Sequence, residues 1–432
     1  MDSMSNAPAR DAYYDALEAR DPAQRERDVL AALPALVRRA QSTPAGAERL
    51  GRVDADAITT RQAFARLPVL RKTELFERQK AQREDRERWD PFGGCSTIGW
   101  RGMLAAQGAR RVFQSPGPIY EPEGAGADVF RVARSIWAAG FRAGDLVHCS
   151  FSYHLTPAGA MMEAGCHAIG CTTFAGGVGN TELQLQAIAD LRPHGYVGTP
   201  SFLKILVEKA AESRTSIASL RKALVSGEAF PPSLRDWLRE RGIEGYQAYA
   251  TADVGLVAYE TVAREGLVVD EGVLLEIVRP GTDDPVPDGE VGEVVVTVLT
   301  TDYPLVRFGT GDLSAVLPGP CPTGRTQLRI KGWMGRADQT TKMRGMLVHP
   351  SQVADIVRRH AEIIRARLVV EGEMASDRLT LKAEVRARSE GLVDAIAASV
   401  RDITKLRAEV VLAAAGSLPN DGKVIEDARS YK

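Results

Sequence analysis

The sequence has no apolar run that approaches the roughly 20 residues of a membrane-spanning helix, so no such helix is predicted. It has no CxxC pair, and its odd number of cysteines, five, argues against a disulfide framework and a zinc ribbon. It has no excess of charge: a net charge of -1 and an isoelectric point near 6.6 predict no nucleic-acid partner and no membrane partner. The first residues are acidic and polar, unlike a signal peptide, and a cytoplasmic protein is expected.

With 432 residues the chain is too long for one hydrophobic core, and two or three domains are expected. Helix and strand patterns alternate between about 129 and 300, which predicts a mainly parallel sheet covered on both faces. A compact set of strands and helices follows Gly335. The predicted fold is therefore α/β, with a large N-terminal domain of mixed or parallel sheet (1–334) and a small, mobile C-terminal α+β domain (335–432).

Hydrophobic periodicity predicts the individual elements. A helix is expected over about 9–50, and another opens after a turn at 67–75 with Thr73 as its cap. Further helices are predicted at 129–142, 158–169, 182–191, 348–360 and 390–406, and strands at 146–151, 171–175, 195–199, 294–299, 366–370, 379–385 and 409–413.

A glycine-punctuated segment, residues 303–312 (YPLVRFGTGD), is interpreted as a turn that ends in a lone carboxylate, Asp312. A carboxylate in this setting is well placed to accept hydrogen bonds from both hydroxyls of a ribose. Arg336, a short way on, could meet the phosphate attached to that ribose. The alternative for Asp312 is a solvated loop with chance charges.

The order of these segments resembles the ribose-binding and hinge segments of adenylate-forming enzymes, and the surrounding sequence resembles the phenylacetate–CoA ligase family. Four more segments carry the resemblance in the family's order, and together they cover most of the chain from about 60 to 430. They are a helix–turn–strand (134–148), a strand-end turn (224–230), an aromatic–small–Ser/Thr–x–acid motif (249–255) and a C-terminal loop with a lysine (416–423).

The resemblance implies a large adenylate-forming domain, a small C-terminal domain and an ATP-dependent ligase. In this family a phenylacetate-like aromatic acid attacks the α-phosphate of ATP, and a thiol, CoA, then displaces AMP from the acyl-adenylate. ATP, CoA and Mg²⁺ are thus the implied cofactors, a small carboxylic acid is the implied substrate, and a homodimer is compatible with the family. Catabolism of aromatic compounds is the implied setting.

Site residues follow from the resemblance, position by position. Lys423 and Arg336 are assigned to catalysis, Asp338 to the hinge between the domains, and Asp253 to Mg²⁺, although the family has a Glu there and the shorter side chain reaches less far. For three of the residues in the site a purely structural role is the alternative: Lys423 as a surface lysine, Tyr249 as a core aromatic and His154 as a structural histidine. The nucleotide site comprises Ser226, Gly227, Glu228, Tyr249, Ala250, Thr251, Asp312 and Arg336, and the acyl pocket Tyr153, His154, Leu155 and Phe230.

The phosphate-binding loop departs from the family pattern. The aligned segment, 113–124, keeps Ser115 and Gly117 but has no Thr and no Lys, and its three prolines lack an N–H donor. Glu121 and Glu123 add negative charge, and one or the other is expected to face solvent or to pair with a nearby arginine such as Arg110 or Arg111. This loop predicts an affinity for ATP that barely exceeds that for AMP.

Because of that loop, three functions are carried forward. The first is a working ligase with a divergent loop. The second is an enzyme that handles acyl groups and CoA without ATP, such as an acyltransferase or a thioesterase-like enzyme. The third is a non-catalytic homologue that binds a nucleotide or an acyl group.

Overall fold

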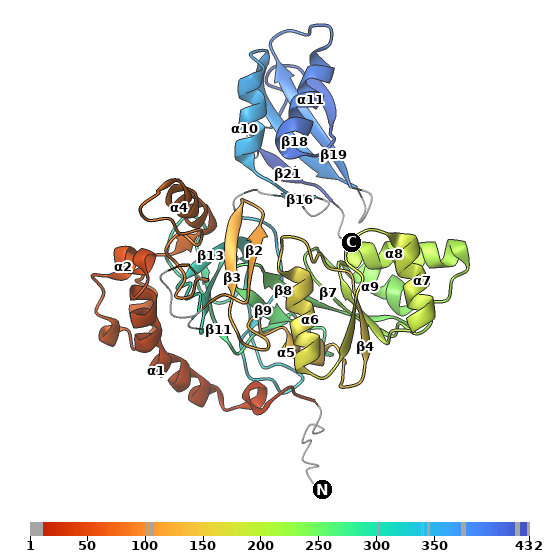
Figure 1. Ribbon diagram of the computed structural model, residues 1–432. Helices are drawn as coiled ribbons and strands as arrows, with labels where there is room; N and C mark the ends of the chain where they lie inside the picture. The colour runs from red at the N-terminus through yellow and green to blue at the C-terminus, as the bar shows by residue number, and fades with distance from the viewer. Residues whose placement is uncertain are drawn as a thin grey trace. The chain divides into compact units, whose positions relative to one another are not determined.

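The computed structural model describes residues 12–100, 102–103, 108–300, 302–337, 339, 341–343, 346–372, 377–419 and 424–429 (Figure 1). The chain divides into two compact units. The first consists of Met1–Phe230 and Leu234–Met334, and the second of Pro231–Ser233 and Gly335–Lys432.

A nine-stranded sheet forms the centre of the first unit, with the strand order β14-β15-β10-β9-β8-β7-β6-β4-β5. The strands from β8 to β5 pair in parallel, and the others pair antiparallel. The parallel strands are β4 (Leu146–Cys149), β5 (Thr172–Ala175), β6 (Gly195–Gly198), β7 (Lys222–Val225) and β8 (Glu244–Thr251). The others are β9 (Gly255–Tyr259), β10 (Leu267–Val269), β14 (Val316–Leu317) and β15 (Arg329–Ile330).

Crossover helices cover both faces of the parallel strands, as Figure 1 shows. The step from β4 to β5 runs toward the sheet edge, whereas the later steps run the opposite way. Because such crossovers are right-handed, α6 (Ala158–Ala168) lies on one face, and α7 (Thr181–Leu191) and α8 (Pro200–Ser213) lie on the other. Helix α5 (Ala133–Ala138) packs beside α6, and α9 (Pro232–Arg239) leads into β8.

A four-stranded sheet, in the order β1-β13-β12-β11, completes the first unit. Its strand β12 (Gly292–Val298) is buried at all seven positions, as its valine-rich sequence predicts. The other strands are β1 (Leu70–Arg71), β11 (Val273–Val278) and β13 (Phe308–Ser314), and a hairpin is formed by β2 (Arg111–Ser115) and β3 (Ile119–Glu123). The remaining helices are η1 (Ala16–Ala19), α1 (Pro22–Gln41), α2 (Pro44–Leu50), η2 (Ala55–Ala57), α3 (Arg61–Phe64) and α4 (Lys72–Glu84).

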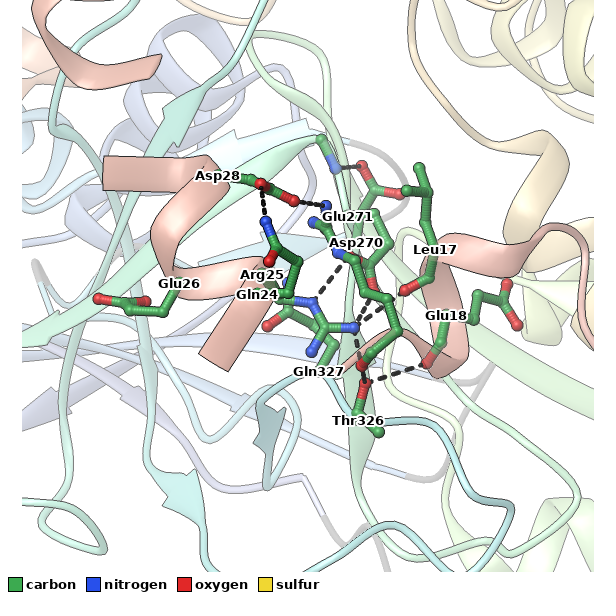
Figure 2. A network of polar contacts seen from close by, with 12 residues as sticks. Leu17, Glu18, Gln24, Arg25, Glu26, Asp28, Asp270, Glu271, Thr326 and Gln327 are labelled. Carbon is green, nitrogen blue, oxygen red and sulfur yellow. Dashed lines mark hydrogen bonds and ion pairs between the residues drawn. The ribbon is translucent and has the colours of Figure 1, made fainter. Parts of the chain in front are cut away.

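A buried ionic network ties the N-terminal segment to the body of the first unit (Figure 2). The Arg25 guanidinium donates to both carboxylate oxygens of Glu271, at 3.0 and 2.9 Å, and to the Leu17 carbonyl and the Thr326 hydroxyl, at 3.0 and 2.8 Å. Both members of the Arg25–Glu271 pair are buried. Removal of one partner from such a pair costs about 3–5 kcal/mol, so the network holds the start of α1 firmly in place.

The second unit has its own core. Its four-stranded sheet has the order β20-β19-β18-β21, and the helices α10 (Pro350–Arg359) and α11 (Leu392–Thr404) share a hydrophobic cluster with it. The strands are β18 (Ile363–Glu371), β19 (Arg378–Val385), β20 (Glu409–Ala413) and β21 (Ile425–Asp427), and β16 (Thr341–Met343) pairs with β17 (Met346–Val348).

The α/β class predicted from the sequence is confirmed, but several element predictions are wrong in detail. Within 12–50 the predicted single helix is three separate helices, η1, α1 and α2, and Pro22 and Pro44 start the second and third of them. Helix α4 begins at Lys72, so Thr73 lies inside it and is not its cap. Residues 308–314 form strand β13 and not a turn, because they pair with β12 on one side and β1 on the other. In the described part of the chain, no helix combines the length and apolar character needed to cross a membrane.

Candidate functional site

The predicted site residues of the first unit gather where parallel strands end. Ser226, Gly227 and Glu228 follow β7, and the segment from Tyr249 to Asp253 closes β8. In open α/β sheets, ligands bind outside the carboxyl ends of the strands. The parallel register of β7 and β8 therefore brings two of the predicted nucleotide-binding segments to the same edge of the sheet.

Tyr249 and Asp312 are in direct contact. The Tyr249 hydroxyl donates to Asp312 Oδ2 at 2.8 Å, and the Trp333 indole N–H donates to Asp312 Oδ1 at 3.1 Å. The Asp312 side chain is thus held from both sides. Asp312 lies on β13 and is buried, so it does not belong to a solvated loop. Trp333 has no counterpart among the predicted site residues.

The turn after β7 is shaped by backbone contacts. The Ser226 N–H donates to the Gly198 carbonyl at 3.1 Å, and Gly227 adopts a φ of 82°, which a side chain would disfavour. Glu228 accepts from the Ser201 N–H at the start of α8, at 3.3 Å. On β8, Ala250 and Thr251 are half-buried. Their assignment to the nucleotide remains a prediction.

The segment predicted as a divergent phosphate loop is the tight hairpin of β2 and β3. Its turn consists of Pro116, Gly117 and Pro118, of which only Gly117 has a backbone N–H. The Ser115 hydroxyl donates to Glu121 within the hairpin. The turn therefore offers a polyphosphate one amide donor, and the serine that could have helped is already bonded to a carboxylate.

Glu121 and Glu123 both face inward from this hairpin. They alternate with Tyr120 and Pro122 along β3 and share a face with the buried Ile119, and each is only 1% exposed. The prediction for Glu123 is correct for its pairing, since Arg111 Nε lies 3.1 Å from Glu123 Oε2. Glu121, by contrast, neither faces solvent nor pairs with Arg110 or Arg111. Burial, and then the neighbouring Asp253 carboxylate, raise its pKa well above the ordinary value.

Asp253, the predicted Mg²⁺ ligand, is buried and pairs with a lysine that the sequence did not single out. Lys72 Nζ lies 2.8 Å from Asp253 Oδ2, whereas Asp253 Oδ1 has no hydrogen-bond partner. Across the described residues, no group of three or more His, Cys, Asp or Glu side chains could hold a metal ion. Mg²⁺ is typically bound by one or two carboxylates, with phosphate and water oxygens as its other ligands. The Asp253 oxygen that has no hydrogen-bond partner fits that ion.

The predicted acyl-pocket residues fall in two environments. Tyr153 is half-buried against Gly159, and burial together with the Cys149 thiol and the Glu163 carboxylate raises its pKa. Leu155 is 69% exposed, and its carbonyl accepts from the Gln114 N–H at 2.8 Å, which joins the turn after β4 to the hairpin. His154 is exposed. Phe230 is buried under the Arg235 guanidinium, 5.1 Å away, and packs on Gly245 of β8.

Three predicted residues belong to the second unit. Arg336 is half-buried and follows Gly335, whose φ of 124° is one that a side chain would disfavour. Asp338 and Lys423 lie outside the described residues.

The sequence is similar to known enzymes. Residues 127–298 match the sequence model of the AMP-binding enzymes. The phenylacetate-coenzyme A ligase of Pseudomonas putida is 31% identical over 310 residues, which are 68% of this chain and 70% of that enzyme. The phenylacetate-coenzyme A ligase of Thermus thermophilus is 33% identical over 263 residues, and the match spans 59% of its length.

The fold is similar to that of a solved CoA ligase. A 2-hydroxyisobutyryl-CoA ligase, in complex with 2-HIB-AMP and CoA, superimposes with a TM-score of 0.82 over 99% of this chain and 95% of that one. The sequences are 24% identical, so this likeness demonstrates a shared fold.

Proposed function

The chain belongs to the phenylacetate–coenzyme A ligase family of AMP-binding enzymes, and from that premise we propose that it is an AMP-forming acid–CoA ligase. The reaction has two steps: a carboxylate attacks the α-phosphate of ATP to give an acyl-adenylate and pyrophosphate, and the CoA thiol then displaces AMP. The observation that carries the proposal is the contact between Tyr249 and Asp312 at the carboxyl end of β8, where the family motif for the nucleotide lies.

In this proposal the chain's own groups share the work of the first step. Asp312 accepts the ribose hydroxyls, and Tyr249 holds that carboxylate in place while its ring lies beside the base. Lys423 and Arg336 supply positive charge while the phosphate oxygens gather negative charge. Mg²⁺, when bound at Asp253, neutralises the phosphates of ATP.

We propose an aromatic, phenylacetate-like acid as the substrate. The phenylacetate-coenzyme A ligases among the relatives support this choice. Because a 2-hydroxyisobutyryl-CoA ligase shares the fold, a short hydroxy acid is the substrate against which the aromatic acid should be compared. ATP, CoA and Mg²⁺ as cofactors, a cytoplasmic location and a homodimer belong to the same proposal.

A second candidate is an enzyme that works on acyl groups and CoA without ATP. The hairpin favours it, since the turn has a single N–H donor and two buried carboxylates lie on the following strand. Such an enzyme would transfer or hydrolyse a preformed acyl-CoA and would release no AMP.

A panel of acids tests the proposal. The protein is incubated with ATP, Mg²⁺ and CoA and with phenylacetate, benzoate, 2-hydroxyisobutyrate or acetate, and AMP and the CoA thioester are measured by mass spectrometry. We expect AMP and thioester in equal amounts, fastest with an aromatic acid. Turnover of a separately supplied acyl-CoA without release of AMP would support the second candidate. Binding of AMP, measured by calorimetry, without any turnover would support a non-catalytic homologue.

A further inference from the structure

A small pocket beside the end of β8 contains polar atoms that lack partners. It has a volume of about 90 Å³, and Glu121, Asp253 and Tyr303 are among the residues that line it. These three residues are 1%, 7% and 8% exposed. Glu121 Oε2, Asp253 Oδ1 and the Tyr303 hydroxyl are buried and make no hydrogen bond. A buried polar atom left unsatisfied costs about 1–3 kcal/mol, so three of them at one pocket indicate that a ligand satisfies them.

The charges around this pocket indicate what kind of ligand that is. Two of the three groups are carboxyl groups, and Lys72 Nζ already lies 2.8 Å from the other oxygen of Asp253. The other oxygen of Glu121 accepts from Ser115. The two remaining oxygens are hard carboxyl oxygens, which are the ligands that Mg²⁺ and Mn²⁺ prefer.

We propose that Glu121 acts with Asp253 as a second carboxylate ligand of a divalent cation, and that this cation holds the β- and γ-phosphates of ATP in place of the loop amides and lysine that this chain lacks. The inference rests on the proposed function, since it concerns how this chain binds ATP. Phosphate and water oxygens complete the ligand set, as is usual for Mg²⁺.

Metal binding by Glu121 explains why a carboxylate lies where the phosphates of ATP are expected to bind. Without a metal ion, Glu121 gives the polyphosphate no attractive charge, and the hairpin turn has only the Gly117 N–H to bind it. With a metal ion bound, the same carboxylate becomes an attractive part of the site. The weak preference for ATP over AMP predicted from the loop is therefore expected only without divalent cations, and Mg²⁺ or Mn²⁺ should produce a clear preference for ATP.

The test measures Mn²⁺ binding by EPR, with and without the non-reacting analogue α,β-methylene-ATP, and with neither acid nor CoA present. In wild-type protein we expect the analogue and Mn²⁺ to strengthen each other's binding. Glu121→Gln should weaken Mn²⁺ binding about ten-fold or more, because loss of even an outer partner of a metal ligand costs about 10–100-fold. Glu123→Gln is the matched control: it is equally buried on the same strand and lies against Arg111, and it should leave Mn²⁺ affinity unchanged.

Two results would overturn the inference. One is wild-type Mn²⁺ affinity in Glu121→Gln, and the other is tighter binding of the analogue by that variant, which would mean that Glu121 only repels phosphate. Should Glu121→Gln fail to fold, Glu121→Asp keeps a carboxylate one methylene shorter and should still weaken Mn²⁺ binding. A Mn²⁺ site that depends on Glu121 supports the inference even if no acid yields AMP. If the protein forms AMP normally and Glu121→Gln binds Mn²⁺ as the wild type does, the inference is overturned and the proposed function still holds.

Discussion

Replacement of Lys423 by alanine is expected to slow adenylate formation by about 10²–10³-fold, the usual effect of removing a group that stabilises charge in a transition state. In the proposed mechanism its ammonium is needed only while the phosphate oxygens gather charge in the first step. Thioester formation from a supplied acyl-adenylate and CoA should therefore stay close to the wild-type rate. Both half-reactions can be followed separately by rapid quench.

A matched lysine provides the control for this variant. Lys209 is exposed on α8 and pairs with Glu212 at 2.6 Å, so Lys209→Ala removes one positive charge and should alter neither half-reaction. Equal losses in both half-reactions of Lys423→Ala would assign that lysine a structural role.

Asp312→Ala should weaken nucleotide binding about ten-fold or more, as measured by calorimetry with AMP. Hydrogen bonds to a charged group contribute about 1.5–3 kcal/mol, and 1.4 kcal/mol corresponds to a factor of ten in affinity. The same change removes one acceptor from the Tyr249 hydroxyl and one from the Trp333 N–H, so some loss of stability is expected as well.

Tyr249→Phe separates these two effects. This variant removes one donor to Asp312 but keeps the carboxylate and the aromatic ring, so nucleotide affinity should fall far less than in Asp312→Ala. An unchanged affinity in Asp312→Ala, with the variant folded, would remove Asp312 from the nucleotide site.

The local sequence predicted the helices and strands whose hydrophobic pattern lies within their own residues. Examples are the apolar run of β12, the alternation of β4, α6 and α7, and strands β18, β19 and β20 of the second unit. Their continuous burial or their period of two or 3.6 residues is visible in a short window. Strand β13 was missed because Gly309 and Gly311 suggest a turn. Its extended form depends on pairing with β12 and with β1, and β1 lies more than two hundred residues earlier in the chain.

The site was predicted less completely, for a similar reason. Lys72 reaches Asp253 across 181 residues of sequence, and nothing in the residues around Lys72 indicates that partner. The inward direction of Glu121 did have a local signal, since Ile119, Glu121 and Glu123 alternate with a period of two. Pro118 and Pro122, on either side of Glu121, suggested a loop and made this alternation hard to recognise.

The central claim is that this chain adenylates a carboxylic acid, and exchange of labelled pyrophosphate into ATP tests that step most directly. With wild-type protein, Mg²⁺ and an aromatic acid but no CoA, the account predicts exchange that requires the acid and falls sharply in Asp312→Ala. The absence of exchange with every acid of the panel, from protein that binds AMP, would contradict it.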